Sequence, residues 1–317
     1  MNLIRLFERA KCATYLMLAC GVLFLNACDF GDVATKRFLQ NASVYFSRDA
    51  GASFTRLSPD VFSYQKGFNR NLVLRTSAGF VVIDCFNPDF ARGLADELRE
   101  RFPGESVHTL IYSHYHLDHV RGGAELAPAR VIGHRDLKKY WRFLELDRDG
   151  ILPLTREING DTRLNIGGLE LRLLDMGLSH TDTLFAVHLP ESRVLFAPDL
   201  GFVRSLPPAG LPDMYYPGYI AALERLAKID FDTYVPSHFQ TGKRADLREY
   251  LTFLKETRAL VRKAYDRHGP IAEPGAAGHY YDEIYLPLKA KYGDWVGFDE
   301  MILPFLVRNF AGVYLGY

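Results

Sequence analysis

The stretch that decides the fold reads Ser113-His114-Tyr115-His116-Leu117-Asp118-His119. Three histidines and one aspartate stand within six positions, directly after the short apolar run 109–112, which is typical of a buried strand. Zinc binds imidazole nitrogen and carboxylate oxygen at about 2.0 to 2.2 Å, and a loop leaving a strand can bring such groups to one point. The stretch therefore predicts a metal site at the end of a strand.

The sequence around this stretch alternates between strand and helix patterns. Residues 71–86 form two β-rich runs around a Ser-Ala-Gly turn, and residues 91–102 carry apolar side chains at helical spacing before Pro103-Gly104. A strand over 130–133, hairpins over 164–174 and 184–197, and helices over 136–144, 219–227 and 246–267 are also expected. Strands and helices in mixed order, with several hairpins, predict a layered α/β fold.

The His-x-His-x-Asp-His string is the motif of the metallo-β-lactamase superfamily, which this sequence resembles. The resemblance continues in the family's order with His180 in Gly-Leu-Ser-His, Asp199 in Phe-Ala-Pro-Asp and His238 in Val-Pro-Ser-His. Upstream, Val-Val-Ile-Asp84 matches a strand ending in an aspartate that supports a metal ligand. The resemblance covers about residues 71–243. It implies an αββα sandwich of two mixed β-sheets flanked by helices.

The resemblance also implies two zinc ions per chain and assigns their ligands. The first ion falls to His114, His116 and His180, the second to Asp118, His119 and His238, and Asp199 bridges both. Two such ions bring the pKa of a shared water close to neutral. The implied activity is therefore hydrolysis of a small ester, lactone or lactam by a metal-bridging hydroxide, with Asp118 orienting the water.

Two loops depart from the family pattern. Ser237 and Phe239 flank the last histidine where the family often has glycines, which predicts a bulkier pocket floor or an altered loop. Gly177 stands further from His180 than the common Gly-His pairing, which predicts a longer loop. These two departures leave the substrate specificity of the site open.

The remaining histidines and the downstream cysteine are expected to be structural. His108, His134, His268 and His279 are predicted to be surface or helix-end residues without ligand neighbours, His188 a packed or exposed strand residue, and Cys85 a buried one. Residues 205–219 form either a pocket wall or a rigid connecting loop. Residues 280–317 either cover the pocket or form a dimer surface.

The N-terminal sequence predicts export. Arg5, Arg9 and Lys11 precede the apolar run 13–27, which is short for a membrane span and typical of a signal peptide. Leu-Asn-Ala-Cys28 resembles a bacterial lipobox, so we expect a signal peptide over 1–27 and a lipid on Cys28. Plain cleavage and an uncleaved anchor are the alternatives. Residues 28–317 are expected to form one domain with a helical C-terminal extension on the periplasmic side of the cell envelope.

The charge composition bears on which classes of molecule the protein binds. With 38 basic and 38 acidic residues the formal net charge is zero, so no overall field attracts nucleic acid, and a small-molecule substrate is expected. Two rival functions stay open: a mononuclear iron oxygenase or sulfur-handling enzyme on the same fold, and a non-catalytic envelope lipoprotein. The complete ligand set argues against the second. The oligomeric state is open.

Overall fold

The computed structural model describes residues 51–142, 150–270 and 276–317. The predicted signal peptide, Cys28 and the end of the helix predicted over 136–144 lie outside these residues. The chain divides into two compact units, the larger made of Arg48–Val203 and Pro217–Leu251, the smaller including Arg204–Tyr216 and Thr252–Tyr317. The prediction of one domain over residues 28–317 stays a prediction. Within the described ranges, no helix is both long and apolar enough to cross a bilayer.

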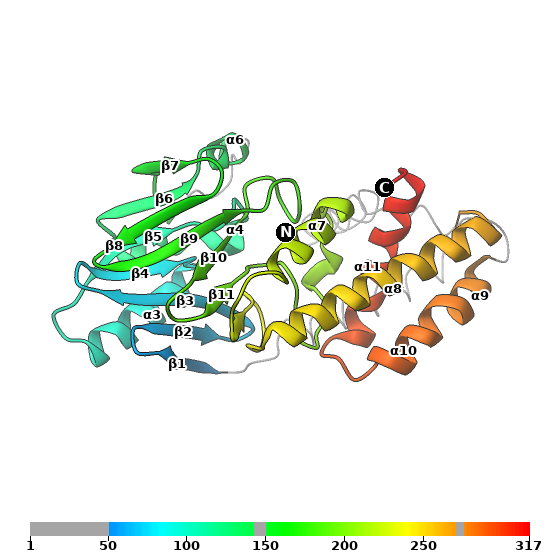
Figure 1. Ribbon diagram of the computed structural model, residues 1–317, viewed down its shortest axis with the longest axis horizontal. Coiled ribbons are helices and arrows are strands. Elements are labelled where there is room, and N and C mark those ends of the chain that lie inside the picture. The colour runs from blue at the N-terminus through cyan, green and yellow to red at the C-terminus, as the bar shows by residue number, and fades with distance from the viewer. Residues whose placement is uncertain (1–50, 143–149, 271–275) are drawn as a thin grey trace, which may run out of the picture. The chain divides into compact units, whose positions relative to one another are not determined.

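The larger unit contains a seven-stranded sheet whose strands lie side by side in chain order (Figure 1). The strands are β1 (Ala52–Ser58), β2 (Val61–Lys66), β3 (Asn69–Thr76), β4 (Gly79–Ile83), β5 (Val107–Ile111), β6 (Arg130–His134) and β7 (Arg156–Ile158). The pairs from β1 to β4 are antiparallel, and those from β4 to β7 are parallel. The sheet is therefore mixed.

A five-stranded mixed sheet in the order β12-β11-β10-β9-β8 completes the sandwich. The strands are β8 (Thr162–Ile166), β9 (Leu169–Asp175), β10 (Phe185–Leu189), β11 (Val194–Phe196) and β12 (Thr233–Val235). Only β11 and β12 pair in parallel. The hairpins predicted from the sequence are β3-β4, β8-β9 and β10-β11, so the predicted sandwich of two mixed sheets flanked by helices is confirmed.

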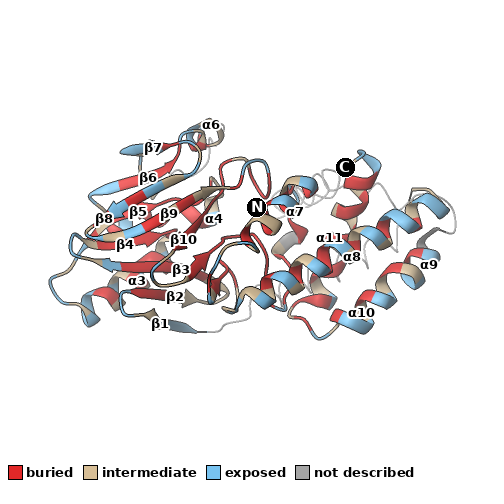
Figure 2. Cartoon of the chain, in the orientation of Figure 1, coloured by how far each residue is buried: buried red, intermediate tan, exposed pale blue. Residues whose placement is uncertain are grey.

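The side-chain alternation of β4 explains how the layers pack. Val81 and Ile83 join the core between the two sheets, whereas Phe80 and Val82 point to the other face. Successive strand residues face opposite sides, so the continuous apolar run of this strand is buried on both. Figure 2 shows buried residues along the central strands and exposed ones on the edge strand β1.

Helix α3 (Pro88–Arg101) covers that other face of the first sheet. The side chain of Asn87 caps it by accepting a hydrogen bond from Phe90 N at 2.9 Å, and Pro88 suits the first turn. Phe90, Leu94 and Leu98 recur at i, i+4 and i+8 and are buried in the same core, each contributing roughly 1.5 to 3 kcal/mol. The cap places the start of the helix three residues earlier than the predicted 91.

The other helices of the larger unit are short or continue past its limits. They are α4 (Leu117–Val120), α5 (Gly123–Leu126), α6 (Leu137–Trp141), α7 (Tyr216–Leu226) and α8 (Arg244–His268). The last two correspond to the helices predicted over 219–227 and 246–267.

The smaller unit is helical in its described part. Besides the latter part of α8 it contains η1 (Pro208–Gly210), α9 (Ala276–Tyr280), the π-helical η2 (Tyr281–Tyr285), α10 (Leu286–Tyr292) and α11 (Phe298–Tyr314). Its core includes Phe253, whose ring lies 4.9 Å from Tyr292, 5.0 Å from Trp295 and 5.4 Å from Phe305. Gly210 has φ 72°, and a Cβ there would meet the backbone of Pro304 at 2.8 Å, so η1 packs directly on α11.

Candidate metal centre

The seven predicted ligands lie in the larger unit, in segments that follow or join strand ends. Ile111 ends β5 ahead of the histidine-rich loop, β9 and β10 flank His180, β11 precedes Asp199, and β12 precedes His238. Helix α4 carries the last part of the first loop and includes Asp118 and His119. β4 runs parallel to β5, and β11 runs parallel to β12, so within each sheet these strands end on one side.

The structure brings the predicted ligands together in two groups. Potential ligand atoms of His114, His116, His180 and Asp199 lie within 4.8 Å of one another. Those of Asp118, His119 and His238 do the same. The two groups match the division that the sequence resemblance implied. The Nε2 atom of His180 lies 3.1 Å from Nδ1 of His116, so these two ring nitrogens face each other.

Asp199 lies between the two groups. Its Oδ2 atom is 3.3 Å from Nε2 of His114 and 3.1 Å from Nε2 of His119, which belong to different groups. The same oxygen is 3.3 Å from Nε2 of His180, and Oδ1 is 3.0 Å from Nε2 of His238. Asp199 therefore contacts histidines of both groups.

Two buried ring nitrogens show that the residues fit a metal. The Nε2 atoms of His114 and His119 are buried and make no hydrogen bond of acceptable geometry, although both approach Asp199. Leaving a buried polar atom unsatisfied costs about 1 to 3 kcal/mol. An ion held between these nitrogens and the carboxylate would remove that cost. The donor set of imidazoles and carboxylates suits a transition metal such as zinc.

Burial and neighbouring charges set the protonation of two members of the cluster, His114 and Asp199. Burial, together with His119 and His116, lowers the pKa of His114 well below its usual value, which keeps this imidazole neutral. Burial opposes ionisation of Asp199, but His119 and His238 outweigh it and hold the pKa of this carboxyl well below its usual range. A neutral imidazole and an ionised carboxylate are the forms that bind metal.

Asp84 orients two of the histidines. Its Oδ2 atom accepts hydrogen bonds from Nδ1 of His119 at 2.8 Å and from Oγ of Ser113 at 2.7 Å, and its Oδ1 atom accepts from Ser113 N at 2.8 Å. The Ser113 hydroxyl lies 2.9 Å from Nδ1 of His114 and can accept its proton. Both rings are thereby held with Nε2 toward the cluster.

Ser237 positions Asp199, a role that the sequence did not predict for it. Its buried hydroxyl donates to Oδ1 of Asp199 at 2.8 Å and accepts from Asp199 N at 3.1 Å. Tyr219 supports the same loop by donating to Asp199 O at 2.8 Å and accepting from Gly201 N at 3.0 Å. The available signal was the serine beside the last histidine, where the family often has glycine.

The loop after His238, for which the sequence predicts a bulkier pocket floor or an altered course, carries Phe239. Phe239 has φ 62°, in the left-handed region that favours glycine. Its backbone is held by Phe239 N donating to Phe68 O at 2.7 Å and by Nε of Arg70 donating to Phe239 O at 3.0 Å. The ring of Phe68 lies 5.2 Å from that of His238. The loop thus keeps a glycine-like backbone with an aromatic side chain.

Helix α6 joins the loops of two ligands through an assembly that we call the α6 clamp, made of Tyr115, Lys139, Tyr140 and Asp182. The rings of Tyr115 and Tyr140 stack at 3.9 Å, beside His116. The Tyr140 hydroxyl donates to Oδ1 of Asp182 at 2.5 Å, and Nζ of Lys139 donates to Oδ2 at 2.8 Å. Asp182 stands two residues after His180, so the clamp connects the His116 loop to the His180 loop.

Of the predictions for Cys85 and for the histidines outside the ligand set, some are confirmed and others are wrong. Cys85 is buried as predicted, and His188 is a packed strand residue with Nε2 3.2 Å from Asp230 O. The surface prediction for His134 is wrong, because this residue ends β6 with 4% exposure and its Nδ1 accepts from Asp136 N at 3.1 Å. His268 and His279 were predicted to have no ligand neighbours, but both lie near Glu283.

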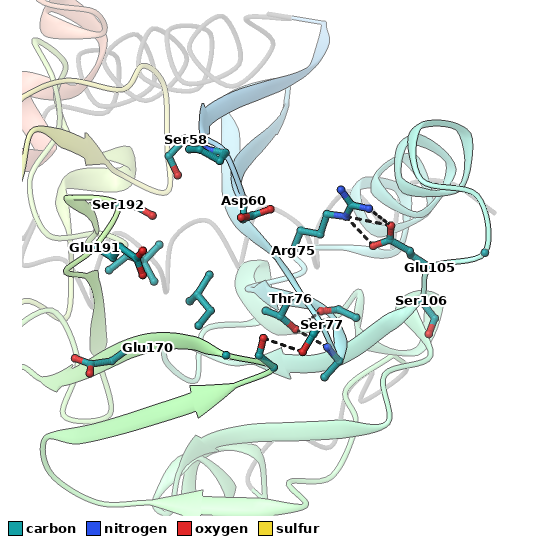
Figure 3. A pocket seen from close by; sticks show the side chains of 18 residues that line it. Ser58, Asp60, Arg75, Thr76, Ser77, Glu105, Ser106, Glu170, Glu191 and Ser192 are labelled. Carbon is teal, nitrogen blue, oxygen red and sulfur yellow. Dashed lines mark hydrogen bonds and ion pairs between the residues drawn. The ribbon is translucent and has the colours of Figure 1, made fainter.

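A polar cleft of about 1050 Å³ lies at the other end of the same strands (Figure 3). Its lining comes from the turns between β1 and β2, β3 and β4, β8 and β9, and β10 and β11, and from the residues just before β5. Arg75 and Glu105 form an ion pair in it. None of the seven predicted ligands lines this cleft, so it is separate from the metal centre.

Comparisons with known proteins bear on the region that carries this centre. The sequence profile of the metallo-beta-lactamase superfamily matches residues 67–238. The chain is 33% identical over 184 residues to the 2,4-dinitroanisole O-demethylase subunit alpha of Nocardioides sp. strain JS1661, covering 56% of this chain and 55% of that protein. It is 24% identical over 201 residues to the metallo-beta-lactamase type 2 of Bacillus cereus, covering 61% and 76%.

A solved structure extends the comparison to the fold. A metallo-beta-lactamase from Pontibacter korlensis matches with a TM-score of 0.55 at 22% identity, covering 64% of this chain and 99% of that one. The match to the demethylase subunit spans about half of that subunit's length.

Proposed function

The chain belongs to the metallo-beta-lactamase superfamily, and on that premise we propose that it is a dinuclear zinc-dependent hydrolase of a small ester, lactone or lactam. The observation that carries the proposal is the position of Asp199, whose oxygens approach histidines of both ligand groups at 3.0 to 3.3 Å. A carboxylate placed in this way serves two ions better than one. Five imidazoles and two carboxylates also suit zinc better than the harder magnesium or calcium ions.

Each ion would have its own set of ligands. One would be held by His114, His116 and His180, the other by Asp118, His119 and His238, with Asp199 shared. When bound, such a pair supplies a Lewis acid for the substrate's carbonyl oxygen and lowers the pKa of a water molecule.

The protein's own groups would orient the reactants and move the proton. Asp118 has a side chain that is 61% exposed and lies 3.7 Å from Nε2 of His119, so it faces both the cluster and solvent. In this position its carboxylate can accept the proton of the attacking water and return it to the leaving group. Asp84 and Ser113 would keep His114 and His119 fixed while the charge moves.

Cleavage of an activated aryl methyl ether is a second candidate. The relative that is 33% identical is named as a subunit of a 2,4-dinitroanisole O-demethylase, and it overlaps the part of the chain that matches the family. Hydrolysis of such an ether consumes water and releases a phenol and methanol, whereas an oxygenase would release formaldehyde. The product therefore separates this candidate from the iron oxygenase alternative.

Metal content and chelation test the proposal together. Elemental analysis of the full chain should find about two zinc ions bound by the seven proposed ligands. Both His116→Ala and Asp199→Ala should contain fewer zinc ions per chain. His108→Ala, which changes a histidine outside both ligand groups, should keep the wild-type content. Hydrolysis of esters, lactones and β-lactams should stop on chelation and return with zinc. Activity that persists in the chelator, or iron at one ion per chain, would refute the zinc hydrolase.

We also propose that the chain is exported and anchored by a lipid on Cys28, with a small molecule as substrate and no nucleic-acid partner. The support is the charged start, the apolar run 13–27 and the lipobox-like Leu-Asn-Ala-Cys sequence. Radiolabelled palmitate should enter the wild-type chain and be absent from Cys28→Ser. Equal labelling of both chains would contradict the anchor.

A further inference from the structure

A second group of potential metal ligands lies in the helical unit. His268 ends α8, His279 belongs to α9, and Glu283 belongs to η2. Their ligand atoms lie within 4.8 Å of one another. We propose that these three residues form a surface site for one divalent transition-metal ion of the zinc class, separate from the proposed catalytic pair. We call it the helical-unit site.

The backbone places the three residues for joint binding. His279 and Glu283 are four residues apart on a continuous helical stretch, because α9 runs directly into η2, so their side chains lie on the same face. His268 reaches them from a different helix, with Nε2 2.9 Å from Oε1 of Glu283. An ion here would connect the end of α8 to the α9–η2 stretch. The π-helical turn that carries Glu283 is rare in proteins and occurs frequently at functional sites.

The two imidazoles would have to turn before they could share an ion. The rings of His268 and His279 stack with centroids 4.2 Å apart and planes 5° apart. Two nitrogens bound to one zinc ion at about 2.0 to 2.1 Å lie roughly 3.3 Å from each other, so the rings must turn edge-on to share an ion. His279 is exposed, and the side chain of His268 is 20% exposed, which leaves room for that turn and for water as a further ligand.

The contacts of Glu283 divide its two oxygens between a positive side chain and the proposed site. Arg267 contacts Oε2 through Nη1 at 3.3 Å, which leaves Oε1 directed at His268. Arg267 would then position the carboxylate from behind, as the partners of metal ligands usually do. Two imidazoles and one carboxylate select zinc, nickel, copper or cobalt over calcium or magnesium.

The test counts ions in matched variants of the full chain. Wild type, His279→Ala, Glu283→Gln and the control Asp282→Asn are stripped with a chelator, equilibrated with excess zinc, dialysed and analysed for zinc. Asp282 is an exposed neighbour on the same element, so its variant makes the same charge change as Glu283→Gln outside the site. We expect one zinc ion fewer per chain in His279→Ala and Glu283→Gln than in wild type and Asp282→Asn.

Each outcome decides between a metal site and a simple ion pair. Equal zinc in all four chains would overturn the proposal and leave His268 and Glu283 as an ion pair. Glu283→Gln is close to isosteric, so a loss there with unchanged helix content by circular dichroism excludes unfolding as the cause. Failure of the catalytic pair would lower the count equally in all four chains. The difference between variants should also persist in the His116→Ala background.

Discussion

Three residues at the candidate metal centre have an unusual backbone conformation. Asp84, Asp199 and Phe239 have φ values of 63°, 52° and 62°, in the left-handed region that residues with a side chain seldom adopt. Each costs of order 1 kcal/mol or more and persists because its surroundings enforce it. Asp84 is fixed by Ser113 and His119, and Asp199 by Ser237. Backbone strain of this kind is often found at functional sites.

The charge of Asp84 can be tested without changing its backbone. Asparagine tolerates the left-handed region, so Asp84→Asn should fold, but its amide nitrogen cannot accept from His119 or Ser113. Loss of such a partner usually weakens metal binding 10- to 100-fold, and we expect a decrease of about that size. Competition with a chromophoric chelator measures it. Asp60→Asn, in the exposed turn between β1 and β2, is the control, and equal affinity in both variants would contradict the role of Asp84.

At the scale of elements, the α6 clamp should control how firmly the His180 loop holds its ion. Tyr140→Phe keeps the stack on Tyr115 but removes the hydrogen bond to Asp182, and Lys139→Ala removes the ion pair. A hydrogen bond to a charged group contributes about 1.5 to 3 kcal/mol, so we expect roughly 10-fold weaker binding of one zinc ion in Tyr140→Phe.

The matched control for the clamp is the neighbouring lysine of α6. Lys138 pairs with Glu157 at 2.8 Å and not with Asp182, so Lys138→Ala should leave zinc affinity unchanged. Hydrogen exchange should rise in residues 176–183 of Tyr140→Phe and stay at the wild-type level in Lys138→Ala. Unaltered exchange and affinity in both clamp variants would show that α6 does not position the loop.

Elements with strong apolar periodicity were predictable from the sequence, and contacts between distant segments were not. The hairpin of β3 and β4 and the helix α3 follow from local pattern and turn residues. The bond from Ser237 to Asp199 and that from Tyr140 to Asp182 join residues about 40 positions apart, and no local pattern reports them. His134 was misjudged for the same reason, because its burial depends on the neighbouring layers rather than on its own strand.

At the scale of the whole molecule, strand direction separates two polar regions of the larger unit. Strands β4, β5 and β11 begin near the cleft of Figure 3 and end at the metal centre. Residues beyond the carboxyl ends of strands converge, which is where open α/β sheets commonly bind ligands. Ligands from both sheets meet there, with His114 following the first sheet and Asp199 the second. A pair of metal ions at this place would therefore join the two sheets.

A link between the two sheets should appear as metal-dependent stability that is lost in acid. Zinc at about 100 times its Kd adds about 2.7 kcal/mol per site, which corresponds to a Tm increase of roughly 5 to 10 °C. Imidazole binds metal only when neutral, so protons compete with zinc for the histidines, and the increase should be present at neutral pH and be lost as the pH falls. Asp199, with a pKa held well below its usual range, stays ionised over this pH range, so the histidines set the transition.

Calorimetry of stripped and zinc-loaded chains at neutral pH and near pH 5.5 measures the difference, with Asp199→Ala as the control. An equal zinc-dependent increase at both pH values would show that the stabilising ion is not held by these histidines.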